Sequence, residues 1–493
     1  MKVSILDQTH AEYDGERLQE LRALHEGGAA WDALKNTWFP KFARESTDVW
    51  KDRKEQAEYV NHAGPVVSML SALLFSSETQ ADGADGAYYA GLREDCDGQG
   101  TDWDDLWREQ LEDAQVGGWS AVWINFPAKP EDAVVESVAD QDQFGLRNAF
   151  LVPLSAEQIR NWGVDANGLS WVMLRGVFSR QLGPTEPART VYRWTAITRE
   201  TVTTWEWVSQ EDKLVPGSDE DVQQLSQVQH GVKDPAGRPA LPVVPIELPP
   251  GLWTMGKLRG PALKLTRAEN DLDWALHQAA NELLVIKTRA TAGEVKTGHG
   301  AYLILGVDDD ASFVGPSGVA FEHLDKRVTS TREDLYRVVH QMALAADQGA
   351  AEASRSGESK SMDWQAMEII LAAFQALVIE AMQRCLRLIA ASRGEPTVAK
   401  AATVGGLEGW KTEDLTAWLE SVLLAGDASK LSPTYRKEVA KHEVRRLLEG
   451  KVDEKTMQAI EKEIDAADAT DSFFAGVTPP PPADRSGATT PAE

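Results

Sequence analysis

The spacing of hydrophobic positions divides the first half of the chain into helices followed by strands. Leucine and tryptophan recur at helical intervals from about residue 14 to 76, and an amphipathic helix is predicted over Thr101–Val116. The period then changes, because Trp119–Phe126 alternates between apolar and polar residues as a half-buried strand does. Further segments rich in Val, Thr, Trp and Tyr are 170–178, 190–196 and 201–208. We therefore predict a β-rich insertion at about 119–250, which ends in an extended, proline-rich passage between domains over Arg238–Pro250.

The next part of the chain combines two helical patterns with a short irregular one. A long helix is predicted over 257–286, with Pro261 in its first turn. Six glycines punctuate the module that follows, 287–325, and indicate short strands. A second helix is predicted over 326–346, where Ser330 and Glu333 have the spacing of a capping box.

The chain then continues into its longest apolar pattern. Small residues dominate 347–358, which predicts a loop. The segment 359–403 carries apolar residues at helical intervals and predicts a helix to about residue 391. Further amphipathic helices are predicted within 404–470, and a flexible, proline-containing tail over 471–493. The fold class predicted from these patterns is α+β and mainly helical.

The charge balance excludes some classes of partner. Among 493 residues, 50 are Lys or Arg and 77 are Asp or Glu, which gives a net charge of −27. A chain this acidic does not hold DNA or an anionic membrane by bulk charge, so any contact with nucleic acid is local, weak or transient. No apolar stretch is long enough for a signal peptide or a membrane span, and we expect a soluble chain in the cytoplasm, with no membrane partner.

The sequence offers no assembled set of catalytic residues. Gly251–Lys257 has the glycine and lysine spacing of a phosphate-binding loop, but Leu258 stands where Ser or Thr would contact magnesium. The nine histidines do not cluster, and no GxSxG elbow is present. The two cysteines, Cys96 and Cys385, could form one disulfide, although so few cysteines favour a reducing compartment. We therefore expect a chain that is not an enzyme, with no catalytic residue, cofactor or bound metal.

Asp308, Asp309 and Asp310 form a run of three carboxylates within the glycine-rich module. Three interpretations are open: a divalent-ion site, a surface for protein contact, and a solvated hairpin tip. A run of like charge between two short strands is most often an exposed tip. Charges at such a tip mainly tune the rate and the salt dependence of association with a partner.

Three strings and the order of the predicted parts point to a family. The strings are Tyr59–Asn61 leading to Leu73–Phe75, Leu241–Ile246 (LPVVPI) and Ser354–Lys360 (SRSGESK). Over roughly residues 40–395, the order of helices, β-rich insertion, helix, glycine-rich module, helix, loop and very long helix resembles the portal proteins of tailed bacteriophages, the head–tail connectors. Sequences in this family are so divergent that the resemblance assigns roles to segments of this chain and not to single invariant residues.

The resemblance implies a role for each segment. By analogy, 1–256 would be the wing with its β-rich insertion, and 257–286 and 326–346 the two stem helices. The intervening 287–325 would be the clip. The remaining segments would be the tunnel loop (347–358), the long wing helix (359–403), the crown (404–470) and the tail (471–493).

The resemblance also implies a function and partners. A portal protein forms a homo-oligomeric ring, usually a dodecamer, at one vertex of the virion's capsid, among the major capsid and scaffolding proteins. Double-stranded DNA passes transiently through its channel during packaging and ejection. The terminase large subunit docks on it first, and head–tail adaptor proteins dock later. The resemblance places Asp308, Asp309 and Asp310 in the terminase and adaptor contact, and Arg355, Ser356, Gly357 and Lys360 at the DNA channel.

The local charge agrees with this reading. Over 257–344 the chain carries eleven Lys and Arg and twelve Asp and Glu, so the net charge of this segment is −1. A near-neutral channel lets DNA slide, because each neutralised phosphate adds affinity. The alternative hypothesis is a non-enzymatic α+β scaffold or adaptor that binds protein partners through its 17 tryptophans.

Overall fold

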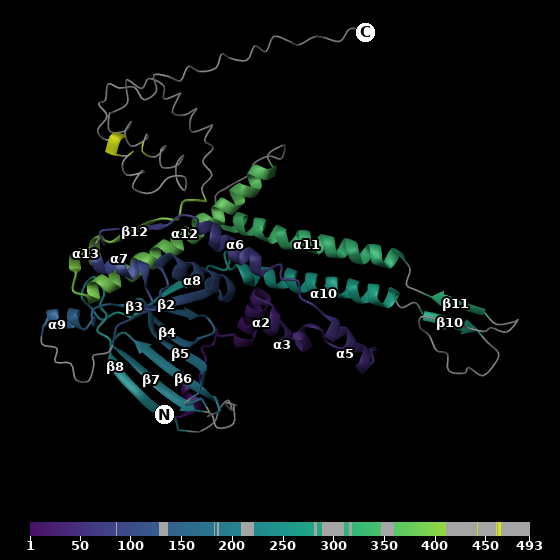
Figure 1. Cartoon of the computed structure of the whole chain (residues 1–493), viewed down its shortest axis with the longest axis horizontal. Coiled ribbons are helices and arrows are strands. Elements are labelled where there is room, and N and C mark those ends of the chain that lie inside the picture. The colour runs from purple at the N-terminus through teal and green to yellow at the C-terminus, as the bar shows by residue number, and fades with distance from the viewer. Residues whose placement is uncertain are drawn as a thin grey trace, which may run out of the picture. The chain divides into compact units, whose positions relative to one another are not determined.

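The computed structural model describes most of the chain in two compact units, Met1–Lys411 and Thr412–Glu493. The described residues are 1–84, 86–127, 137–181, 183–184, 187–208, 221–280, 283–287, 310–314, 318–346, 359–410, 441, 460 and 462–464. All elements discussed below belong to the first unit (Figure 1). Helices and sheets both contribute to its core, which confirms the α+β class.

Short helices form the N-terminal layer, as the leucine pattern predicted. They are α2 (Gly15–Glu26), α3 (Gly28–Ala33), α4 (Lys35–Trp38), α5 (Thr47–Gln56), α6 (Gly64–Leu74), α7 (Ala87–Glu94) and α8 (Trp103–Gly117). The first helix, α1 (Val3–Leu6), belongs instead to the core cluster of the five-stranded sheet described below. Leu21, Leu24, Leu70 and Leu111 from three helices of the layer are fully buried in one core cluster. Helix α8 begins where Asp102 accepts a hydrogen bond from the Asp105 amide and ends at Gly118, which has φ +88°.

His25 in α2 makes the stability of this layer depend on pH. Burial, aided by the nearby Arg22 charge, lowers the pKa of His25, and neither ring nitrogen has a hydrogen-bond partner among the described residues. A lowered pKa means that the unfolded chain binds the proton more readily. Stability contributed by neutral His25 is therefore present above about pH 6.5 and is lost as the pH falls below that value.

We expect urea unfolding of the wild type to show this loss between pH 7.5 and pH 5.5. His25→Phe, which keeps a flat ring and removes the titrating group, should reduce the slope of unfolding free energy against pH. Val49→Ala, at an exposed position in α5, should keep the wild-type slope. An unchanged slope in His25→Phe would show that other groups carry the pH dependence.

A three-stranded antiparallel sheet lies between two parts of the core. Its order is β3-β2-β9, formed by β2 (Trp119–Asn125), β3 (Phe150–Ser155) and β9 (Val243–Glu247). Side chains alternate between its faces: Val122 and Ile124 pack with the helices, while Ala121 packs toward the second sheet. The prediction that the proline-rich passage only connects domains is therefore wrong in part. Val243–Glu247 pairs with β2 as an edge strand of this sheet.

The second sheet has five antiparallel strands and forms most of the predicted β-rich insertion. Its strands are β4 (Ile159–Asp165), β5 (Gly168–Arg180), β6 (Arg189–Thr198), β7 (Thr201–Val208) and β8 (Gln223–Gln229), in that order. One face packs on the first sheet through Val172 and Ile197. The other face buries Trp194 against Val3 and Leu6 of the N-terminal segment. A short helix, α9 (Val138–Gln143), lies between β2 and β3 in the sequence.

The second half has the predicted order of elements with different boundaries. They are α10 (Thr254–Ala280), β10 (Leu283–Lys287), β11 (Asp310–Val314), α11 (Gly318–Ala346) and α12 (Ser359–Ser392), then α13 (Pro396–Ala401) and β12 (Thr403–Gly406). The first helix begins before the predicted 257, so Pro261 lies inside it. It also ends before 286, because 283–287 is a strand.

The start of the second helix also differs from the prediction. Helix α11 begins at Gly318 and not at 326, so Ser330 and Glu333 lie inside the helix and form no capping box. Part of the predicted module 287–325 is therefore helical. The long helix ends at Ser392, close to the predicted 391, and α13 follows it within the segment 359–403. Strand β12 pairs with β1 (Thr79–Asp82) of the N-terminal part.

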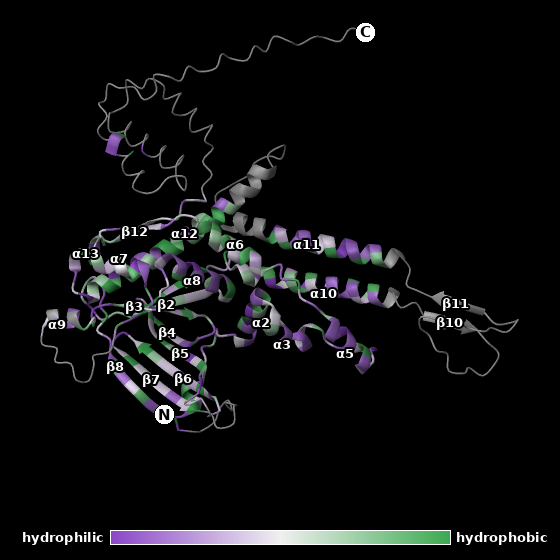
Figure 2. Cartoon of the chain, viewed as in Figure 1, coloured by the Kyte–Doolittle hydropathy of each residue, from purple (hydrophilic) through white to green (hydrophobic). Residues whose placement is uncertain are grey.

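Helix α12 is the apolar centre of the unit. It contacts α6, α8, β9, β12 and α11. The prediction that no apolar stretch is long enough for a membrane span is wrong by this measure, because among the described residues one stretch, Met367–Ser392 in this helix, is long and apolar enough to cross a membrane. Ile370, Phe374, Val378 and Met382 lie on one side of it and are fully buried in the main core cluster, which is the pattern of a core helix. Figure 2 shows the contrast between this hydrophobic helix and the largely hydrophilic α11.

Candidate functional site

Helices α10 and α11 form an antiparallel pair. Two ion pairs connect them, Lys264 Nζ to Asp334 Oδ2 at 3.5 Å and Arg332 Nη2 to Glu269 Oε1 at 3.0 Å. The residue numbers rise along one helix as they fall along the other, which fixes the antiparallel direction. Apolar side chains at helical intervals pack between the two helices. Those buried in the main core cluster are Leu265, Ala268, Val328 and Leu335.

A β-hairpin continues this helix pair at its free end (Figure 1). Strands β10 and β11 are antiparallel, with a register that runs from Leu283 opposite Val314 to Lys287 opposite Asp310. Strand β10 begins shortly after α10 ends, and β11 ends shortly before α11 begins. The two helices and the hairpin thus form one continuous excursion of the chain, which we call the helix–hairpin arm (254–346).

The base of the helix–hairpin arm is held by polar contacts with the N-terminal layer. Glu269 is the centre of these contacts, since the same carboxylate oxygen that pairs with Arg332 lies 3.1 Å from His62 Nε2. The Asn270 amide accepts from the Glu58 amide at 2.9 Å and donates to the Glu58 carbonyl at 2.8 Å. Arg267 Nε donates to the Trp38 carbonyl at 3.1 Å. These bonds fix both the position and the rotation of α10 on the layer.

Farther along the helix–hairpin arm the side chains lose such contacts. Leu276 on α10 is 48% exposed. Charged residues of the two helices nearly balance, since α10 carries four Lys and Arg with three Asp and Glu, and α11 carries four of each. Burial raises the pKa of Asp271 on α10, and the nearby arginines, chiefly Arg327, oppose this shift. The arm therefore presents a nearly neutral surface on a strongly acidic chain.

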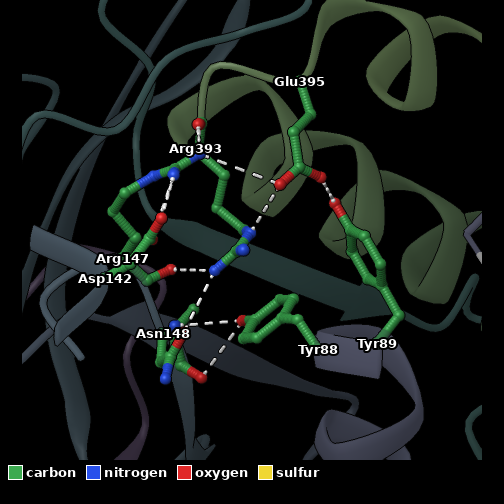
Figure 3. Close-up of polar contacts among 8 residues, drawn as sticks. Tyr88, Tyr89, Asp142, Arg147, Asn148, Arg393 and Glu395 are labelled. Atoms are coloured by element: carbon green, nitrogen blue, oxygen red, sulfur yellow. Dashed lines mark hydrogen bonds and ion pairs between the residues drawn. The ribbon is translucent and has the colours of Figure 1, made fainter. Parts of the chain in front are cut away.

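The end of α12 is joined to the β-rich region by an arginine–carboxylate network, drawn in Figure 3. Arg393 Nη1 donates to the Arg147 carbonyl at 2.7 Å and to Asn148 Oδ1 at 3.1 Å, and its Nε donates to Glu395 Oε1 at 3.0 Å. Its guanidinium carbon lies 3.6 Å from the ring centre of Tyr88. One side chain thus joins the α12–α13 connection to the loop before β3 and to α7.

The other members of the network bind each other around Arg393. Arg147 donates to both Asp142 oxygens at 3.0 Å and to the Arg393 carbonyl. The Tyr89 hydroxyl donates to Glu395 Oε2 at 2.5 Å. Burial raises the pKa of Tyr88 to about 12, and burial together with the bond to Glu395 raises the pKa of Tyr89. Both phenols stay protonated at neutral pH, so Tyr89 remains a hydrogen-bond donor.

We expect Arg393→Ala to lower the free energy of unfolding of the first unit by about 2–3 kcal/mol, because it leaves Glu395 and two acceptors without their charged donor. Arg393→Lys should recover little of this loss, since an ammonium cannot reproduce the planar fork. Arg108→Ala is the matched control. Its exposed pair with Asp105 should contribute less than about 1 kcal/mol. Equal losses for Arg393→Ala and the control, measured by urea unfolding, would contradict the role given to this network.

The structure places few of the residues predicted from the sequence. Asp308, Asp309, Arg355, Ser356 and Gly357 lie outside the described residues. Asp310 is the first residue of β11, opposite Lys287, and Lys360 lies in the first turn of α12. The structure does not bring these two together. Among the described residues, no group of three His, Cys, Asp or Glu is placed to hold a metal ion.

Sequence reasoning missed the Arg393 network and the contacts of Glu269. Each includes pairs far apart in the sequence, such as Glu269–Arg332, 63 residues apart, and Tyr89–Glu395, 306 residues apart. None of these residues lies in a recognisable motif. The only available signal was the Arg-Gly-Glu sequence at the end of an apolar helix, which resembles an ordinary helix end.

No family model matches the sequence, and no curated protein matches it. Solved structures do resemble the chain. One is described as "Virion of native gene transfer agent (GTA) particle", with 11% identity and a TM-score of 0.38 over 84% of this chain and 93% of the other. A second, "Neck of empty GTA particle computed with C6 symmetry", has 12% identity, a TM-score of 0.38 and the same coverage.

Both of these structures are described as parts of a gene transfer agent particle. A TM-score of 0.38 is too low for the likeness to carry a functional conclusion. The proposal below therefore rests on the chain's own architecture and charge.

Proposed function

We propose that the chain is a portal protein, the subunit of a ring-shaped DNA channel at one vertex of a capsid. The observation that carries the proposal is the helix–hairpin arm followed by α12: two antiparallel helices, a hairpin at their free end and a long buried helix directly after them in sequence. In a ring, copies of this arm would line the channel while α12 and the sheets form the outer body.

The charge of the arm supports passage of DNA without tight binding. Every phosphate that a protein neutralises adds salt-dependent affinity, and a conduit must release each phosphate again. The near balance of charges on α10 and α11 contrasts with the net −27 of the chain. Residues 347–358, which include Arg355, Ser356 and Gly357, would meet the DNA at the channel, because they connect the arm to α12 in sequence. Lys360, in the first turn of α12, would lie beside them.

The hairpin end of the arm is the proposed docking site for the terminase large subunit and later for head–tail adaptors. Asp308, Asp309 and Asp310 would contribute negative charge there. In this proposal the chain is not an enzyme, and the terminase supplies the ATP hydrolysis. The capsid and scaffolding proteins would surround the ring in the virion.

Docking is tested by replacing Asp308, Asp309 and Asp310 together by Ala and measuring the rate of terminase binding over a range of salt concentrations. We expect slower association and a weaker salt dependence, because rim charges steer encounter. Replacing Glu16, Asp48 and Asp52 of the N-terminal layer by Ala changes the net charge equally and should leave the rate unchanged. Unaltered terminase binding by the triple Asp variant would show that these three carboxylates are not part of the docking site.

The whole function is tested by packaging in vitro. Empty capsid precursors assembled with the purified chain should package DNA when terminase and ATP are added, and precursors assembled without it should not. DNA packaging that does not require the chain would contradict the proposal and favour a scaffold or adaptor role.

A further inference from the structure

A groove of 660 Å³ runs between α12 and the turns of the five-stranded sheet. Its lining includes Ile379 and Leu388 from α12 and Leu169 and Leu241 from the opposite side, so part of it is apolar. None of the Arg393 network residues lines the groove. It is a separate feature of the same helix.

The charged lining of the groove is mainly basic. Four arginines line it, Arg199, Arg238, Arg384 and Arg387, against two carboxylates, Asp234 and Glu380. An excess of positive charge in a concave surface is unusual on a chain with a net charge of −27. Low-dielectric walls focus the potential of such a surface and raise the local concentration of anions.

The partners of these arginines differ. Arg199 pairs with Asp165 and Arg238 with Asp234, each at 2.7 Å, while Arg387 Nε donates to the Ala402 carbonyl at 3.1 Å. Arg384 is exposed, and no described residue forms an ion pair or hydrogen bond with it. The groove therefore keeps at least one guanidinium without a described ion-pair or hydrogen-bond partner, beside an apolar surface.

We propose that this groove binds carboxylate side chains on the surface of a second copy of the chain, and so forms part of the contact between neighbouring subunits. This inference rests on the proposed ring. In a cyclic ring every contact joins the same two different patches, so one basic groove per copy can meet one acidic patch of the next copy. The acidic composition of the chain supplies carboxylates for that patch.

Electrostatics gives a reason for such a contact. Copies that each carry a net charge of −27 repel one another, and salt screens this repulsion only beyond about 8 Å. A local match of opposite charges at the interface offsets the repulsion where the surfaces are closest, and it fixes which faces meet. Arg384, which has no described partner of its own, is the side chain best placed to make this contact.

Arg384→Glu tests the groove by charge reversal. We expect the protein concentration needed for half-assembly to rise by about tenfold or more, with the effect largest at low salt. Arg44→Glu is the matched control, because Arg44 is also exposed and has no described ion-pair partner, but lies outside the groove. Both variants should unfold at the same urea concentration as the wild type. Assembly of Arg384→Glu at the concentration seen for Arg44→Glu would overturn the inference.

Arg384→Lys identifies the occupant. It keeps the charge and supplies an amine that a carbodiimide couples to a carboxylate in direct contact. In rings assembled from a mixture of ¹⁵N-labelled and unlabelled copies, we expect mass spectrometry to find this amine linked to a carboxylate of another copy. Links only within one copy, or none in assembled rings, would overturn the inference and leave the ring intact. Failure of the wild type to form rings would instead contradict the proposed function, and with it this contact between subunits.

Discussion

Rings built from copies with Ser356→Trp and Gly357→Trp should assemble normally and package almost no DNA. Small side chains occupy most of 347–358, and in the proposed ring one such segment per copy approaches the axis. Two indoles per copy would narrow the channel below the width of a duplex. The same segment carries Arg355, whose exposed charge would contribute about 1 kcal/mol or less per phosphate contact, weak enough for DNA to move past.

Packaging is measured as the amount of nuclease-protected DNA in capsid precursors. Assembly is measured separately, as the mass of the ring. Gly91→Trp is a suitable control, since Gly91 lies on the exposed side of α7 with open space around it. That variant should assemble and package as the wild type does. Normal packaging by the double Trp variant would mean that 347–358 is an ordinary connection between helices.

Phe374→Ala should lower the free energy of unfolding of the first unit by about 3–5 kcal/mol. Phe374 is fully buried on α12, the helix that contacts the N-terminal helices, the first sheet and α11. Its removal leaves a cavity where several elements meet, and the close-packed core around it relaxes only in part. Urea unfolding of the non-assembled chain measures the loss.

Tyr336→Ala provides the comparison for this prediction. Tyr336 has a similar ring but is 55% exposed on α11. Its replacement should change the free energy of unfolding by less than about 0.5 kcal/mol. A loss below about 1 kcal/mol for Phe374→Ala would show that α12 is not the centre of the unit's stability.

The order and type of the long elements followed from local patterns, but several boundaries did not. Pro261 indicated a helix start because proline costs least in the first turn. Helix α10 nevertheless begins at Thr254, since Met255 and Leu258 are fully buried and continue the apolar stripe toward Leu265. In α11, Val328 and Leu335 lie against the core, and packing with α10 extends the helix to Gly318. Tertiary burial outweighed the local signals at both starts.

The candidate site was predictable only as an arrangement of segments. Periodicity indicated two helices around a small strand module, and the structure contains them. The side chains that hold them in place, such as Glu269 with His62, or Arg393 with Arg147, come from distant parts of the sequence. A single sequence gives no signal for such pairs, because nothing in the local pattern of either residue indicates its partner.

The mass of the purified assembly tests the central claim most directly. The account predicts a closed ring with a central channel, whose mass is about twelve times that of the 54.1 kDa chain, seen by native mass spectrometry and by negative-stain imaging of the same sample. A stable monomer or small oligomer at micromolar concentration, with no ring in the images, would contradict it.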